Sequence, residues 1–131
     1  MTILELVNEI NSLSDENEEI ADVISWINDA MAYINVELGA KFPYFSVSDT
    51  EQEPPFPEHW QRLLLIPFAV GRTKQKDSSQ FEYSDAYSEF FENLMKMKSQ
   101  YEVPEEYKDN TIKGRVTESL VYNLPFIYRG W

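Results

Sequence analysis

The side chains able to do acid–base or metal chemistry are numerous in this sequence, but their spacing forms no catalytic or ligand pattern. His59 is the only histidine and cysteine is absent, so the nitrogen and sulfur ligands of a usual zinc site are missing. The acids of SDENEE, residues 14–19, lack the glycine and the ligand spacing of an EF-hand loop. We therefore predict no metal site and no cofactor.

The remaining polar residues do not predict catalysis either. Carboxylate pairs fall on exposed-looking helix faces, where nothing buries one of them and raises its pKa for proton transfer. The four glycines, at positions 39, 71, 114 and 130, are too scattered for a phosphate-binding loop, and no nucleophile motif occurs. We expect His59 to be a partly exposed residue at the start of a helix, and the chain not to be an enzyme.

Charge restricts the classes of partner. The formal net charge of −12 disfavours binding to nucleic acids and to anionic membranes, because both need clustered Lys and Arg. Residues 1–70 carry 13 acidic side chains against Lys41 and Arg62, a net charge of −11, whereas residues 71–131 carry 10 against 9. The first residues match neither a signal peptide nor a membrane span, and the lack of cysteine agrees with a reducing cytoplasm.

Two amphipathic helices are predicted in the first 39 residues. Thr2 is expected to cap the first, whose apolar positions are Ile3, Leu6, Val7, Ile10 and Leu13. Ser14 or Asp15 is expected to cap a longer second helix, which ends at Gly39. The apolar stripe of this second helix consists of Ile20, Val23, Ile24, Ile27, Met31, Ile34 and Leu38.

Trp26 and Tyr33 lie seven residues apart, away from the centre of that stripe. One interpretation is a wide core face. The other is a subunit contact, because Trp and Tyr are enriched in protein interfaces.

Four prolines, Pro43, Pro54, Pro55 and Pro57, exclude a helix or a central strand from residues 41–57. We predict a long loop, with a short strand at PYFSV (43–47) and a stiff surface bend at TEQEPPFPE (50–58). A loop of this length is often functional or bound to a partner.

A third helix is expected from Glu58 to about Lys74, with Pro57 at its first turn. The residues expected on one side of it are Trp60, Leu63, Leu64, Phe68 and Gly71. Pro67 has no amide hydrogen and pushes against the carbonyl four residues earlier, so a kink or a break is predicted there.

The clearest helical pattern lies between residues 79 and 101. Its apolar positions are Tyr83, Tyr87, Phe90, Leu94, Met97 and Tyr101. Phe91 and Met95 widen this stripe, and we predict the central helix of a small bundle with its aromatic residues in the core.

Residues 104–131 lack helical periodicity and are predicted to form an arm. RVTESLVYN, residues 115–123, has the β-branched residues of a strand, and NLPFIYRGW, residues 123–131, is unusually apolar for a chain end. The expected fold is mainly α. It has a small helical bundle over residues 1–103 with a long proline-rich loop, and an extended C-terminal arm with some β-strand over residues 104–131.

Three stretches within residues 17–101 carry a resemblance: WINDAMAYINVEL, HWQRLLLIPFAVGRTKQ and FEYSDAYSEFFENLMKM. Their order and character resemble the head–tail connector, or adaptor, proteins of tailed bacteriophages. The resemblance implies a virion protein of the neck, present in the host cytoplasm during assembly. It implies a homo-oligomeric ring, commonly a dodecamer, beneath the portal protein, which extends the DNA channel and docks a stopper or tail protein.

In that family, chain ends and extended loops insert into the portal or into adjacent subunits, and the arm fits this role. The candidate partner-binding residues are Val121, Tyr122, Leu124, Pro125, Phe126, Ile127, Tyr128 and Trp131 in the arm, with Trp26 and Tyr33 in the bundle. DNA is expected to pass through the lumen without specific binding, since acidic walls repel phosphate.

Three alternatives stay open. The aromatic residues of the arm can instead fold back and complete the core of their own bundle. The acidic surface can mimic DNA and inhibit a nucleic-acid enzyme, in which case binding weakens steeply with salt. A generic helical interaction protein with an unrelated partner is the third alternative.

Overall fold

The computed structural model describes residues 1–76 and 80–109, with residues 80–83 as helical backbone alone. The helices are α1 (Ile3–Ser14), α2 (Ile20–Leu38), α3 (Glu58–Trp60), α4 (Ile66–Lys76) and α5 (Gln80–Gln100). A π-helical turn, η1 (Gln61–Leu65), joins α3 to α4, and a 3₁₀ turn, η2 (Glu105–Tyr107), follows α5. Within the described residues there is no strand, only an isolated antiparallel bridge between Ala40 and Lys108. The predicted mainly α class is confirmed.

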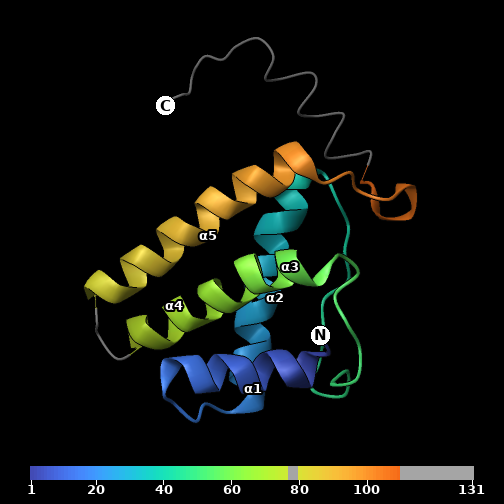
Figure 1. Cartoon of the computed structure of the whole chain (residues 1–131). Helices are drawn as coiled ribbons and strands as arrows, with labels where there is room; N and C mark the ends of the chain where they lie inside the picture. Colours follow the sequence, from blue (N-terminus) through green and yellow to red (C-terminus); the bar gives the residue numbers. More distant parts are fainter. Residues whose placement is uncertain (77–79, 110–131) are drawn as a thin grey trace.

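The central helix of the bundle is α4, which contacts α1, α2 and α5. Figure 1 shows α4 lying between α1 and α5, with α2 crossing behind them. The sequence predicts α5 for the central position, and this is wrong because α5 packs on α4 from one side. That arrangement leaves Phe91 and Met95 largely at the surface.

The core is built from the predicted apolar stripes. Its fully buried side chains include Ile3, Leu6 and Ile10 of α1, Ile27, Met31 and Ile34 of α2, Leu64 and Leu65 of η1, and Phe90, Leu94 and Met97 of α5. Besides Phe91 and Met95, two predicted members are exposed: Leu13 lies on the outer side of the last turn of α1, and Leu63 is turned outward within η1. The side chain of Tyr83 lies outside the described residues.

The backbone amides at the start of α1 are capped by side chains and by the loop that follows α2. The Thr2 hydroxyl accepts a hydrogen bond from the Glu5 amide, and the Glu5 carboxylate accepts one from the Thr2 amide, which completes a capping box. The next open amides, of Ile3 and Leu4, donate to carbonyls of Gln52 and Thr50 at 2.9 and 3.0 Å. The predicted cap at Thr2 is confirmed, and the loop after α2 completes it.

The predicted cap of α2 is wrong. Ser14 is the last residue of α1, and Asp15 ends that helix in the left-handed region with φ of 59°. Both residues therefore belong to the end of α1. Helix α2 begins after Glu19, whose side chain makes no capping hydrogen bond. The connection is held instead by Asn11, whose Oδ1 accepts from the Glu18 amide at 3.0 Å. The predicted C-cap at Gly39 is confirmed, with φ of 64°.

Pro67 interrupts the third predicted helix as expected, through a π turn rather than a sharp break. The turn η1 ends two residues before Pro67, and Pro57 is the N-cap of α3 rather than part of its first turn. Pro67 has no N–H to offer the carbonyl of Leu63, four residues earlier. The Asn93 side chain of α5 donates to that carbonyl at 3.2 Å. An α5 side chain thus supplies a donor that the proline cannot.

The loop from Gly39 to Pro57 is fastened to α2 by two asparagine side chains. Asn35 donates to the Phe42 carbonyl and accepts from the Phe42 amide, at 3.1 and 2.8 Å. Asn28 makes the same pair of bonds with Phe45, at 2.8 and 2.9 Å. The predicted strand at residues 43–47 is wrong, because side-chain amides take the backbone groups that a neighbouring strand would have paired.

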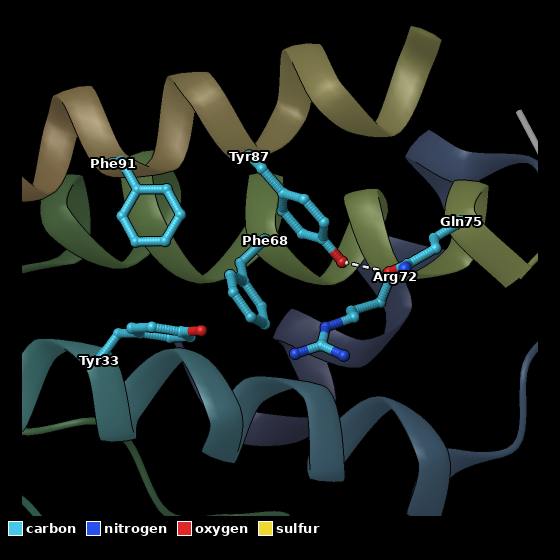
Figure 2. Close-up of a pocket in the computed structure, with 6 residues that line it drawn as sticks. All are labelled: Tyr33, Phe68, Arg72, Gln75, Tyr87 and Phe91. Atoms are coloured by element: carbon cyan, nitrogen blue, oxygen red, sulfur yellow. Dashed lines mark hydrogen bonds between the residues drawn. The ribbon is translucent and has the colours of Figure 1, made fainter. Parts of the chain in front are cut away.

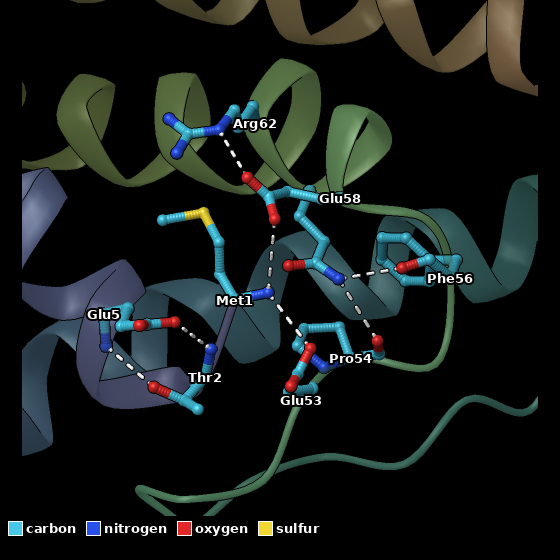
Figure 3. A network of polar contacts seen from close by, with 9 residues as sticks. Met1, Thr2, Glu5, Glu53, Pro54, Phe56, Glu58 and Arg62 are labelled. Carbon is cyan, nitrogen blue, oxygen red and sulfur yellow. Dashed lines mark hydrogen bonds and ion pairs between the residues drawn. The ribbon is translucent and has the colours of Figure 1, made fainter.

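The segment predicted as a surface bend is partly buried. Phe56 is buried and its ring lies 5.2 Å from that of Phe42, while Gln61 Nε2 donates to the carbonyls of Pro54 and Phe56 at 3.3 and 2.8 Å. Figure 3 shows the polar contacts beside this segment. There the Met1 amine lies 3.1 Å from a carboxylate oxygen of Glu53, in an exposed setting where such pairs contribute modestly.

The chain after α5 returns to the end of α2. The Lys41 amide donates to the Tyr107 carbonyl at 2.7 Å and the Asp109 amide to the Gly39 carbonyl at 2.8 Å. The Tyr107 ring lies 5.2 Å from that of Phe42. Residues 104–109, which the sequence assigns to the arm, therefore contact the helical bundle. The predicted strand at 115–123 lies outside the described residues.

Candidate functional site: an aromatic surface between α2 and α5

The predicted partner-binding residues separate into three groups. Trp26 is half-buried and packs against the core. Tyr33 is 46% exposed. The arm residues lie outside the described residues; they are Val121, Tyr122, Leu124, Pro125, Phe126, Ile127, Tyr128 and Trp131. Of the two bundle candidates, Trp26 is therefore mainly a packing residue, and Tyr33 is the one whose ring is largely accessible to solvent.

Tyr33 lies at the junction of α2 with α4 and α5. Its ring is 5.8 Å from that of Phe68, 6.0 Å from Phe90 and 5.4 Å from Phe91. The contact with Phe91 is edge to face at 89°, a favourable geometry for two aromatic rings. Since Phe68 and Phe90 are buried, they hold the inner side of Tyr33 while its outer side faces solvent.

A pocket of about 200 Å³ opens beside this cluster, and we call it the aromatic pocket. It is lined by Tyr33, Phe68, Arg72, Gln75, Tyr87 and Phe91. Figure 2 shows these side chains converging from α2, α4 and α5. The Tyr87 hydroxyl donates to Gln75 Oε1 at 2.8 Å, which fixes one wall of the pocket.

Arg72 gives the pocket its one guanidinium. Its Cζ lies 4.9 Å from the centre of the Phe68 ring and 6.0 Å from that of Tyr87, within cation–π range. Its Nη2 is 3.4 Å from Asp29 Oδ2, so the charge is balanced locally. Its buried Nε has no hydrogen-bond partner among the described residues. The pocket therefore combines four aromatic rings with the polar groups of Arg72 and Gln75, and Asp29, outside the lining, balances the Arg72 charge.

Exposed apolar side chains continue from the pocket along both helices. Val36 lies one turn after Tyr33 on α2, and Met95 lies one turn after Phe91 on α5. All four are 42–64% exposed. Beyond them Lys98 Nζ pairs with Glu37 Oε2 at 2.9 Å and ties the two helices together. We call Tyr33, Val36, Phe91 and Met95 the apolar strip.

The other chemically active side chains are dispersed. His59 is exposed in α3, as predicted, and its ring lies 4.9 Å from that of Trp60. In residues 1–76 and 80–109 no three His, Asp or Glu side chains are grouped to hold a metal ion. Burial, and secondarily the neighbouring Tyr107, raises the pKa of Tyr101 above its usual value. None of the helices in the described ranges is both long and apolar enough to cross a membrane.

The sequence indicates part of this site. It singles out Tyr33 as a possible contact and Phe91 and Met95 as a widened stripe, but it places the last two in the core. Arg72, Gln75 and Val36 receive no prediction. Their signal is weak, because an exposed valine or arginine on an amphipathic helix is ordinary. Only the packing of α2, α4 and α5 places these residues at the pocket or on the strip.

Compared with models of protein families, with curated proteins and with solved structures, the chain gave no match.

Proposed function

We propose that this chain is a structural assembly subunit that acts through protein–protein contacts. The observation that carries the proposal is the apolar strip beside the aromatic pocket. Tyr33 and Phe91 are exposed and their rings lie 5.4 Å apart on a strongly acidic chain; adjoining exposed apolar side chains are typical of interaction sites, whereas single scattered ones are ordinary. Aromatic residues and Met are also enriched in interfaces.

In particular, we propose a head–tail connector of a tailed bacteriophage. It forms a homo-oligomeric ring, commonly of twelve, beneath the portal protein, extends the DNA channel, and docks a stopper or tail protein. The proposed location is the neck of the virion. Support comes from the helical order along residues 17–101 and from the acidic body, which repels DNA in a lumen.

The proposed role of the arm is to bind the portal or a neighbouring subunit. It is an extended C-terminal segment with some β-strand, and its anchors are Leu124, Phe126, Ile127, Tyr128 and Trp131. Subunits of charge −12 repel one another, so assembly needs apolar contacts of this kind. Trp26 contributes to the core in this proposal, and Tyr33 to the contact surface.

The test is binding to purified portal rings encoded by the same genome. The wild-type chain should bind, and Phe126→Ala combined with Trp131→Ala should reduce binding by at least tenfold, since buried aromatic anchors each contribute more than about 1 kcal/mol. Leu13→Ala, on an exposed site of α1, is the matched control and should bind normally. Binding to portal rings is also measured over a series of salt concentrations. Binding through apolar anchors should persist at high salt, whereas charge-driven binding, as expected of a DNA mimic, weakens steeply. Failure of the wild-type chain to bind portal rings at any salt contradicts the connector proposal.

A further inference from the structure

The apolar strip and the arm have complementary composition. The strip is an exposed aromatic and aliphatic surface with a pocket at one end. Residues 123–131 contain five large apolar side chains, three of them aromatic. An aromatic ring is a suitable occupant for the pocket, because it can contact Tyr33 and Phe91 edge to face and approach the Arg72 guanidinium.

Charge favours the same pairing. Residues 1–109 carry 22 acidic side chains against 8 basic ones, a net charge of −14. Residues 110–131 carry three basic side chains, Lys113, Arg115 and Arg129, against Glu118, a net charge of +2. Residues 110–131 are therefore a weakly basic segment joined to a strongly acidic body, which favours their approach to that body at low salt.

The connection also allows it. Asp109 is held at Gly39, directly after the end of α2, and the Glu37–Lys98 ion pair marks the same end of the α2–α5 pair. From Lys98 back to Tyr87 at the pocket is about 16 Å along α5, at about 1.5 Å per residue. Residues 110–122 can extend over about 40 Å, at roughly 3.3 Å per residue. Because about 40 Å exceeds about 16 Å, residues 110–122 are long enough for residue 123 to reach any part of the strip.

We propose that residues 123–131 of each unassembled subunit lie on the apolar strip of the same subunit, with an aromatic ring from Phe126, Tyr128 or Trp131 in the aromatic pocket. The short connection gives the arm an effective concentration near its own strip in the millimolar range, which favours this strip over that of a second copy. The pairing also covers two apolar surfaces that would otherwise promote aggregation. It goes beyond the connector role and does not depend on it, since it concerns the free subunit.

The test uses cross-linking in the full chain, which contains no cysteine of its own. One cysteine is placed in the arm by Asn123→Cys, which leaves every aromatic residue in place, and a second in the strip by Met95→Cys. The control pairs Asn123→Cys with Leu13→Cys, a site of similar exposure on α1. Because both strip and control sites are exposed, the variants should keep the circular dichroism spectrum of the wild-type chain.

The expected result is a monomeric, intramolecular disulfide that forms at least tenfold faster in the Met95 pair than in the Leu13 pair, at a rate independent of protein concentration. Adding Phe126→Ala and Trp131→Ala should remove the difference. Equal rates in the two pairs would overturn the proposal, as would cross-linked dimers whose rate of formation rises with concentration. No portal protein is present, so this assay can fail while portal binding succeeds, and the reverse.

Discussion

Asn93 is expected to compensate for the missing amide hydrogen of Pro67, and its removal gives a specific energetic prediction. Asn93 is 8% exposed, and its Nδ2 donates to the Leu63 carbonyl at 3.2 Å. In Asn93→Ala this carbonyl loses the donor in a part-buried setting, at a cost of about 1–3 kcal/mol. The higher helix propensity of alanine offsets up to about 0.7 kcal/mol. With the full offset, the net loss in the free energy of unfolding should be about 0.3–2.3 kcal/mol.

Whether the effect of Asn93→Ala comes from the amide hydrogen that Pro67 lacks is tested by repeating it in a Pro67→Ala variant. Pro67→Ala introduces an N–H four residues after Leu63, where a helical hydrogen bond to its carbonyl becomes possible. Asn93→Ala should then cost about 0.5 kcal/mol or less, so the double-mutant cycle should show a coupling energy of about 1 kcal/mol.

The assay is urea unfolding followed by far-ultraviolet circular dichroism. The wild-type chain, the two single variants and the double variant are compared, and their m-values should agree, so that a change in midpoint reports a change in stability. Ser99→Ala is the control: it removes an exposed side-chain bond to a carbonyl of the same helix, and should change stability by about 0.5 kcal/mol or less. If Asn93→Ala costs the same in both backgrounds, within about 0.3–0.5 kcal/mol, the two sites are independent and the reasoning is refuted.

Three further predictions concern packing, the loop and pH. A Cβ at Gly71 would lie 2.9 Å from Tyr87 Cε1, so Gly71→Val should push α4 from α5 and lower stability by about 1–3 kcal/mol in thermal unfolding. Asn35→Ala leaves the Phe42 amide and carbonyl without their side-chain partner, and should lower stability by about 2–3 kcal/mol and speed hydrogen exchange at Phe42; unchanged exchange would contradict the anchoring role. Tyr101 has a pKa raised above 10.0 by burial, so its neutral form contributes stability that is fully present below pH 10 and is lost as pH rises through the folded-state pKa. Unfolding free energies measured up to about pH 12 should fall less steeply for Tyr101→Phe than for the wild-type chain.

The helices could be predicted from the sequence because their apolar spacing is regular. Residues 20–38 have a continuous stripe and a glycine cap; the predicted end of α2 before Gly39 is observed, whereas its start lies at Ile20, several residues after the predicted cap. The disturbance at Pro67 was also predictable, because proline removes an amide hydrogen wherever it stands in a helix. Its form was not, since the choice between a kink and a π turn depends on packing, and the side chain that donates to the Leu63 carbonyl, Asn93, lies thirty residues away.

The loop and the site were harder to predict because their determinants are tertiary. Asn28 and Asn35 look like ordinary polar residues on an apolar helix, yet each pairs with both backbone groups of a loop phenylalanine. The sequence places Phe90 on the core stripe of α5 and Phe91 beside it, as a residue that widens the stripe. Only the position of α4 decides that Phe90 is buried and Phe91 forms part of the apolar strip.

The most direct test of the proposed function is the mass of the assembly formed with the portal. Native mass spectrometry of portal rings mixed with the full chain should show one copy of this chain for each portal subunit, added cooperatively as a complete ring. Phe126→Ala combined with Trp131→Ala should leave the portal ring at its own mass. A portal ring that gains no mass from an excess of the wild-type chain, or gains only a single copy, would contradict the connector proposal.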